Sequence, residues 1–75
     1  MVDRWIKIAT DAAASLGLLD ASGRLVRLDS IGVVDYAVAL EEAVGTEIPP
    51  DALDRESFTS LEAVAALLAR VAPSA

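Results

Sequence analysis

Residues 30–45 read SIGVVDYAVALEEAVG, which is the pattern of one amphipathic α-helix. Its apolar residues include a set with the spacing i, i+3, i+4, i+7, i+11, which places side chains on a single buried face: Val33, Tyr36, Ala37, Leu40 and Val44. Ser30 stands where a helix N-cap is expected, and Gly45 supplies a C-terminal stop. The segment therefore predicts a helix that forms one wall of a hydrophobic core.

A second face of this helix carries its other large apolar residues. Ile31, Val34 and Val38 fall there, beside Asp35 and Glu42. The two acids argue against full burial, and a helix with two apolar faces that is not fully buried keeps one face for a partner. We therefore predict a docking face for partner proteins, made of Ile31, Val34, Asp35, Val38, Ala39 and Glu42.

Two further helices are predicted, one near each end of the chain. The N-terminal helix spans about residues 3–16, with Asp3 as its cap and Gly17 as its stop. Its expected buried face consists of Trp5, Ile8, Ala9, Ala12 and Leu16. The C-terminal helix follows a cap at Thr59 or Ser60, and its expected buried stripe consists of Leu61, Val64, Leu67, Leu68 and Val71.

The segments between the helices carry turn signals and apolar anchors. Residues 17–28 contain Asp20 and the pair Ser22-Gly23, and they read as a loop pinned by Leu18, Leu19, Leu25 and Val26. Farther along, Pro49 and Pro50 prevent helix continuation, Asp51 can cap a short turn, and residues 51–57 are expected to form one helical turn or two. Ile48 and Phe58 are expected to be buried. The predicted fold is all-α, a four-helix bundle with a short third helix in one domain of residues 1–75.

The net charge of −6 is concentrated in the middle of the chain. Between Asp29 and Glu62 there are nine acids and a single base, Arg55. A field of this sign repels nucleic acid and anionic membranes, and it attracts proteins that present Lys and Arg.

Several kinds of chemistry are excluded by composition. The chain has no cysteine and no histidine, which excludes disulfides, imidazole metal ligands and Ser-His or Cys-His catalysis. Glu41 and Glu42 are adjacent in sequence and form a solvated polar face more readily than a catalytic pair or a metal site. The sequence contains no uncharged apolar run of about 18 residues, which is the length that membrane insertion of a helix requires. We expect a cytoplasmic monomer that is not an enzyme and holds no metal.

Three segments together resemble those of acyl and peptidyl carrier proteins. They are Leu28-Asp29-Ser30-Ile31, then Val33-Val34-Asp35, then the run from Ala39 to Pro49, which contains Leu-Glu-Glu and Glu-Ile-Pro. The resemblance implies a four-helix carrier fold and 4′-phosphopantetheine attached to Ser30, next to Asp29, with cargo held as a thioester on its thiol. It also implies three partners: a phosphopantetheinyl transferase, an adenylating ligase or acyltransferase that loads the thiol, and a downstream acyl-accepting enzyme.

Two positions depart from the family pattern, because Arg27 replaces a usual glycine and Gly32 replaces a frequent acid. The segment from Ile48 to Ser60 is similar to stand-alone aminoacyl carriers of the D-alanyl type, while polyketide or nonribosomal peptide pathways remain open. Without the resemblance, Ser30 reads simply as a helix cap. The alternative function is an unmodified acidic helical module that binds a basic protein.

Overall fold

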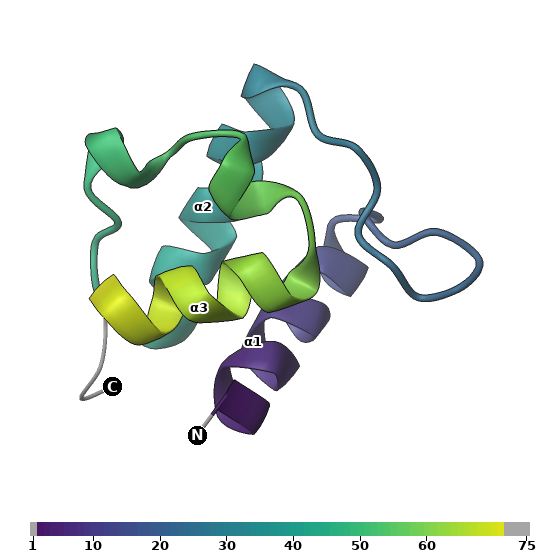
Figure 1. The fold of residues 1–75 in the computed structure, drawn as a ribbon, viewed down its shortest axis with the longest axis horizontal. Coiled ribbons are helices and arrows are strands. Elements are labelled where there is room, and N and C mark those ends of the chain that lie inside the picture. Colours follow the sequence, from purple (N-terminus) through teal and green to yellow (C-terminus); the bar gives the residue numbers. More distant parts are fainter. Residues whose placement is uncertain (1, 72–75) are drawn as a thin grey trace.

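The computed structural model describes residues 2–71, which form three α-helices and two short 3-10 helices (Figure 1). The α-helices are α1 (Val2–Ser15), α2 (Ser30–Val44) and α3 (Leu61–Val71). The 3-10 helices η1 (Pro50–Ala52) and η2 (Glu56–Phe58) lie between α2 and α3. Within residues 2–71 there is no strand, only an isolated antiparallel bridge between Leu19 and Leu25. The all-α class is confirmed.

The helices enclose one apolar core. α1 packs against both α2 and α3, and η2 packs against α3. In Figure 1, α3 crosses in front of the other two helices. The largest fully buried side chains come from α2 and α3: Tyr36, Leu40, Val64, Leu67 and Leu68. The predicted stripes of these two helices are confirmed at those positions, while Val44, Leu61 and Val71 are only partly buried at the edge of the core.

The predicted buried face of α1 needs two corrections. Leu16 is 42% exposed, whereas Ala13, which the pattern did not single out, is fully buried. The helix ends at Ser15, and Gly17 then reverses the chain with φ of +72°, so Leu16 lies just beyond the helix at its exposed end. Asp3 already lies inside α1 and is therefore not its cap.

Tyr36 ties α1 to α2. Its hydroxyl donates a hydrogen bond of 2.6 Å to the backbone carbonyl of Ala9. Its ring meets that of Phe58 edge to face, with the ring centres 5.9 Å apart. Phe58 is 2% exposed, as predicted, and it brings η2 onto the core.

The segment between α1 and α2 is the predicted loop. The Asp20 carboxylate accepts hydrogen bonds from the backbone N–H groups of Arg24 and Ser22, and these bonds lower the pKa of Asp20. Leu25 and Leu28 are buried and anchor the loop to the core. In Figure 1 the turn at residues 20–24 projects away from the helices, while the residues that follow it lead back to the start of α2.

Where one helical turn or two are predicted over residues 51–57, the chain forms two separate 3-10 turns, η1 and η2, and not one continuous third helix. Leu53 leaves helical geometry at ψ of +59°, and the Asp54 carboxylate then accepts a hydrogen bond from the N–H of Ser57. This bond starts the second turn and lowers the pKa of Asp54. Asp51 lies within η1 and does not cap it, since Pro49 holds that position.

The C-terminal end of α2 and the N-terminal end of α3 are formed as predicted. Gly45 adopts φ of +72° and donates its N–H to the carbonyl of Glu41, which closes α2. Of the two candidate caps for α3, Ser60 is the one used, because its hydroxyl oxygen accepts a hydrogen bond from the N–H of Ala63. None of the described helices combines the length and the apolar character needed to cross a bilayer.

Candidate functional site

Ser30 is the first residue of α2, and it is exposed. The preceding residue, Asp29, is the N-cap: its backbone is extended, and its carboxylate accepts a hydrogen bond of 2.7 Å from the N–H of Gly32. The prediction that Ser30 caps the helix is therefore wrong. Within residues 2–71 no side-chain hydrogen bond involves the Ser30 hydroxyl, so it is free to react.

Both serine and aspartate are good cap residues, which is why the sequence did not separate them. The difference matters for chemistry. With Asp29 as the cap, the helix start is stabilised without the serine side chain. The remaining N–H groups of the first turn and the helix dipole favour an anionic group attached at this point.

Gly32 has a structural role at this site. A Cβ placed on Gly32 would lie 3.2 Å from Oδ1 of Asp29 and 3.4 Å from the Leu28 side chain. The first of these distances is shorter than ordinary contact, so glycine permits Asp29 and Leu28 to pack closely over the first turn. Glycine at position 32 thus leaves room for the Asp29 cap, and it also changes the surface that a partner meets.

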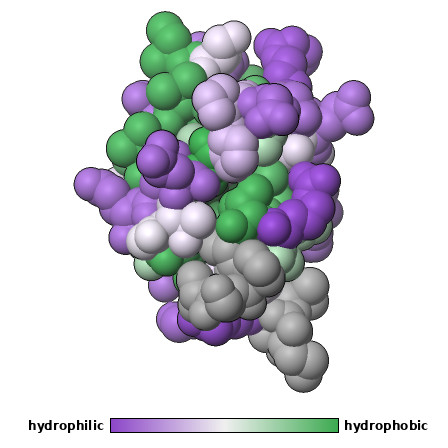
Figure 2. Space-filling model, turned by 90° about the vertical axis from the view of Figure 1, so that its left-hand side faces the viewer, coloured by the Kyte–Doolittle hydropathy of each residue, from purple (hydrophilic) through white to green (hydrophobic). Residues whose placement is uncertain are grey.

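Five of the six residues of the predicted docking face are exposed. Ile31, Val34 and Val38 are 72%, 50% and 49% exposed, a large fraction for such apolar side chains. Asp35 and Glu42 are exposed beside them, and Ala39 is half-buried. Figure 2 shows, on one face of the molecule, hydrophobic side chains gathered along the upper left border with hydrophilic ones around them.

Glu41 does not belong to a solvated acidic pair with Glu42, contrary to the sequence-based interpretation. Glu41 is half-buried, and its Oε2 accepts a hydrogen bond of 2.7 Å from the backbone N–H of Ile48. This bond fixes the turn after α2 against the helix and helps hold Ile48 in the core, where it is 4% exposed. Its role is structural.

A hollow of about 370 Å³ lies between the chain leading into α2 and the turn η2. It is lined by Leu25, Arg27, Leu28, Arg55, Phe58 and Thr59. Sequence reasoning missed this feature because its two walls are about 30 residues apart in the chain and are joined only by the fold. The sequence contains one indication of this hollow, which is Arg27 at a position where the family usually has glycine.

The chemistry of the site is that of attachment rather than catalysis. At the start of α2 the structure places a capping carboxylate and free backbone N–H groups beside Ser30, and two arginines line the nearby hollow, but no histidine exists to act as a base. In residues 2–71 no group of acids could hold a metal ion. The donors at the start of α2 fit a phosphodiester on the serine oxygen.

A comparison with protein families agrees with this chemistry. The model of a family described as the phosphopantetheine attachment site matches residues 2–68, which is most of the chain. No curated protein and no solved structure matches the chain.

Proposed function

Because the chain belongs to the phosphopantetheine attachment family, whose members are carrier proteins and not enzymes, we propose that Ser30 is the residue that carries its 4′-phosphopantetheine. The observation that supports this choice is the exposed hydroxyl at the first residue of α2, released from capping by Asp29. When bound, the prosthetic group supplies a thiol on which cargo is held as a thioester.

Each residue of the site then has a defined task. Asp29 and Gly32 hold the first turn of α2 in shape. The Ser30 oxygen attacks the phosphorus of a pyrophosphate-linked phosphopantetheine donor, the P–O–P bond of the donor breaks, and the nucleotide phosphate leaves. The proton of the hydroxyl passes to a base on the transferring enzyme, since the chain contains no histidine. The free N–H groups of the turn stabilise the negative charge of the phosphodiester.

The partners of such a carrier are a phosphopantetheinyl transferase, an adenylating ligase or acyltransferase that loads the thiol, and a downstream enzyme that accepts the acyl group. We propose that they dock on α2 through Ile31, Val34, Asp35, Val38, Ala39 and Glu42. Exposed apolar side chains flanked by acids support this, because they suit brief contact with a basic partner.

The cargo is acyl or aminoacyl. The similarity of residues 48–60 to D-alanyl-type carriers favours an amino acid, and a polyketide or nonribosomal peptide pathway is the other possibility. We further propose that this chain forms one carrier domain and that the protein is cytoplasmic and monomeric.

The test is mass spectrometry after co-expression with a promiscuous phosphopantetheinyl transferase. We expect the chain to gain one phosphopantetheine, and Ser30→Ala to abolish the gain. The variant should remain helical by circular dichroism and lose no more than about 0.5 kcal/mol of stability, because Asp29 still caps α2. The matched control is Ser22→Ala, which alters another exposed serine and should be labelled fully.

Two results would contradict the proposal. Labelling that persists in Ser30→Ala, or that moves to Ser57 or Ser60, would show that another serine is the attachment point. A wild-type chain that is folded but never labelled would favour the alternative, an unmodified acidic helical module that binds a basic protein through the same face of α2.

A further inference from the structure

The hollow beside α2 is distinguished by its charge. Arg55 is the only base between Asp29 and Glu62, a segment with nine acids, and it lines this hollow together with Arg27. No acid lines it. In contrast, two further hollows on the described surface are lined by an arginine together with at least one acid, Arg24 with Glu62 in one and Arg70 with Asp51 and Asp54 in the other.

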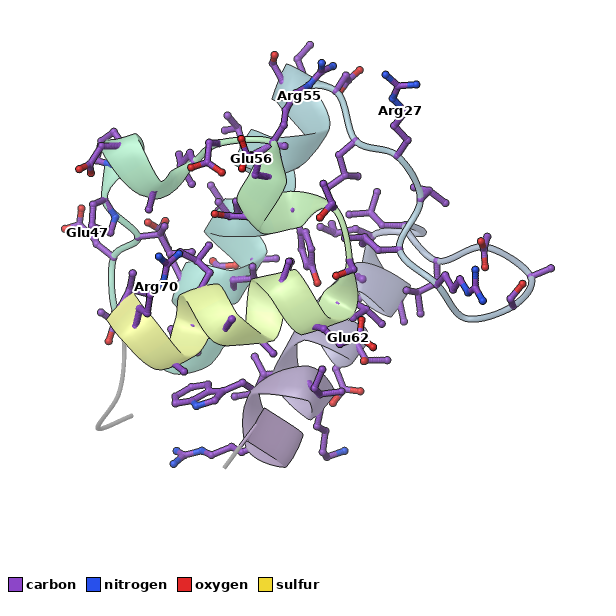
Figure 3. All side chains as sticks on the ribbon, viewed as in Figure 1. Arg27, Glu47, Arg55, Glu56, Glu62 and Arg70 are labelled. Atoms are coloured by element: carbon purple, nitrogen blue, oxygen red, sulfur yellow. The ribbon has the colours of Figure 1, made fainter. Side chains whose placement is uncertain are left out.

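The two arginines are available for a ligand. The single ion pair within residues 2–71 joins Lys7 to Asp11, so neither Arg27 nor Arg55 has an acidic partner there. Both are exposed, and Figure 3 shows both side chains at the end of the molecule where α2 begins. Glu56 follows Arg55 in sequence but does not line the hollow.

The floor between the arginines is apolar. It is formed by Leu25, Leu28 and Phe58, which are 9%, 8% and 2% exposed. Leu28 also packs against the first turn of α2 and stands two residues before Ser30. The hollow therefore opens next to the attachment point, with cations at its rim and hydrocarbon at its base.

These features suit the first part of an arm attached to Ser30, which consists of a phosphodiester followed by a branched hydrocarbon. We propose that the hollow binds this part of the prosthetic group, with Arg27 and Arg55 contacting the phosphodiester and the apolar floor receiving the adjoining methyl groups. The inference rests on Ser30 as the attachment residue. The arm then lies against the protein at its base.

Two physical arguments favour this occupant. A group tethered next to a site reaches a high effective concentration there, so weak contacts suffice to hold it. The phosphodiester also adds negative charge to a chain that is already acidic. The hollow can accept this charge because two arginines and no acids line it. Arginine is well suited to the task because its planar fork can contact two phosphate oxygens at once.

The experiment compares apo and holo forms of the ¹⁵N-labelled chain without any cargo. We expect the Nε–Hε signals of Arg27 and Arg55 to shift when the arm is attached, and those of Arg24 and Arg70 to stay in place. The holo form should also unfold at a higher temperature than the apo form, by several degrees. Arg27→Gln and Arg55→Gln should each reduce this difference, and Arg24→Gln should preserve it. The double variant should reduce the difference further, to what the N–H groups at the start of α2 contribute by themselves.

The outcomes separate this inference from the proposed function. If mass spectrometry shows that no holo form is made on Ser30, the proposed function itself fails. If the holo form is complete but neither arginine signal moves and the unfolding temperature is unchanged, only the hollow is assigned wrongly. Shifts that appear only after a carboxylate-bearing cargo is loaded would equally overturn it, because the arginines would then bind cargo and not the base of the arm.

Discussion

At the residue scale, the site depends on a division of labour between two neighbouring side chains. Asp29 satisfies the N–H of Gly32 and so stabilises the start of α2, which leaves Ser30 free for modification. A serine used as a cap would have its oxygen committed to the backbone. The order Asp-Ser therefore combines a stable helix start with an accessible nucleophilic oxygen.

This arrangement predicts the effect of changing the cap. Asp29→Ala should reduce the free energy of unfolding by about 1 kcal/mol, and Asp29→Asn by much less, because asparagine also caps well. Urea denaturation followed by circular dichroism measures both. Asp35→Ala, at an exposed position within α2, is the control and should change stability by no more than about 0.5 kcal/mol. Equal losses for Asp29→Ala and Asp35→Ala would contradict the assignment of the cap.

At the element scale, much of the fold follows from the pattern of apolar residues. The spacing within α2 predicts its buried stripe, and the acids Asp35 and Glu42 beside its other apolar residues predict its exposed second face. The pattern fails at element ends. Leu16 matches the helical period but lies beyond the last helical residue of α1, and residues 51–57 break into two turns where Leu53 leaves helical geometry.

For the candidate site too, the sequence predicts what lies on one helix but not what depends on packing between segments. It predicted the position of Ser30 at the start of α2 and the exposed face of that helix, because both lie on one continuous element. It did not place the hollow between Arg27 and Arg55 or the bond from Ile48 to Glu41, because these depend on how separate segments pack. Contacts of that kind are properties of the fold and leave no local periodicity in the chain.

Tyr36, which joins α1 to α2, predicts a sensitivity to alkaline pH. Burial raises the pKa of its phenol above the ordinary value of 10.0, so the folded protein retains the proton longer than the unfolded chain does. The stability that this contributes is fully present below about pH 10 and is lost as the pH rises further. Tyr36 is the only tyrosine, so its ionisation can be followed by ultraviolet absorbance.

Ionisation should coincide with loss of helical circular dichroism, because the phenolate cannot donate to the Ala9 carbonyl. Tyr36→Phe should be less stable at neutral pH by about 1 kcal/mol, the usual contribution of one hydrogen bond, but should not show this alkaline transition. A tyrosine that titrates freely while the helices persist would argue that the ring is not enclosed as described.

At the scale of the whole molecule, two different surfaces lie near the start of α2. On one side α2 presents exposed apolar residues among acids, and on the other the arginine-lined hollow is locally cationic. A carrier must show its attachment point to several enzymes in turn while keeping its prosthetic group available. In the proposed assignment, partner contacts and arm contacts lie on different segments, so each can change without disturbing the other.

The charge distribution predicts how partners find the carrier. Reversing Asp35 and Glu42 to Lys should slow loading by the cognate enzyme, because charges around a small apolar contact act mainly on the rate of association. The effect should shrink at high salt, where exposed charges are screened. Thermal stability should change little, since both acids are exposed and exposed charges contribute little to folding.

Glu62→Lys, a change at another exposed acid, on α3, is the control, and loading kinetics at low and high salt are the measurement. If Glu62→Lys impairs loading as much as the changes on α2, or if salt alters none of the rates, partners must approach the carrier by a face other than α2.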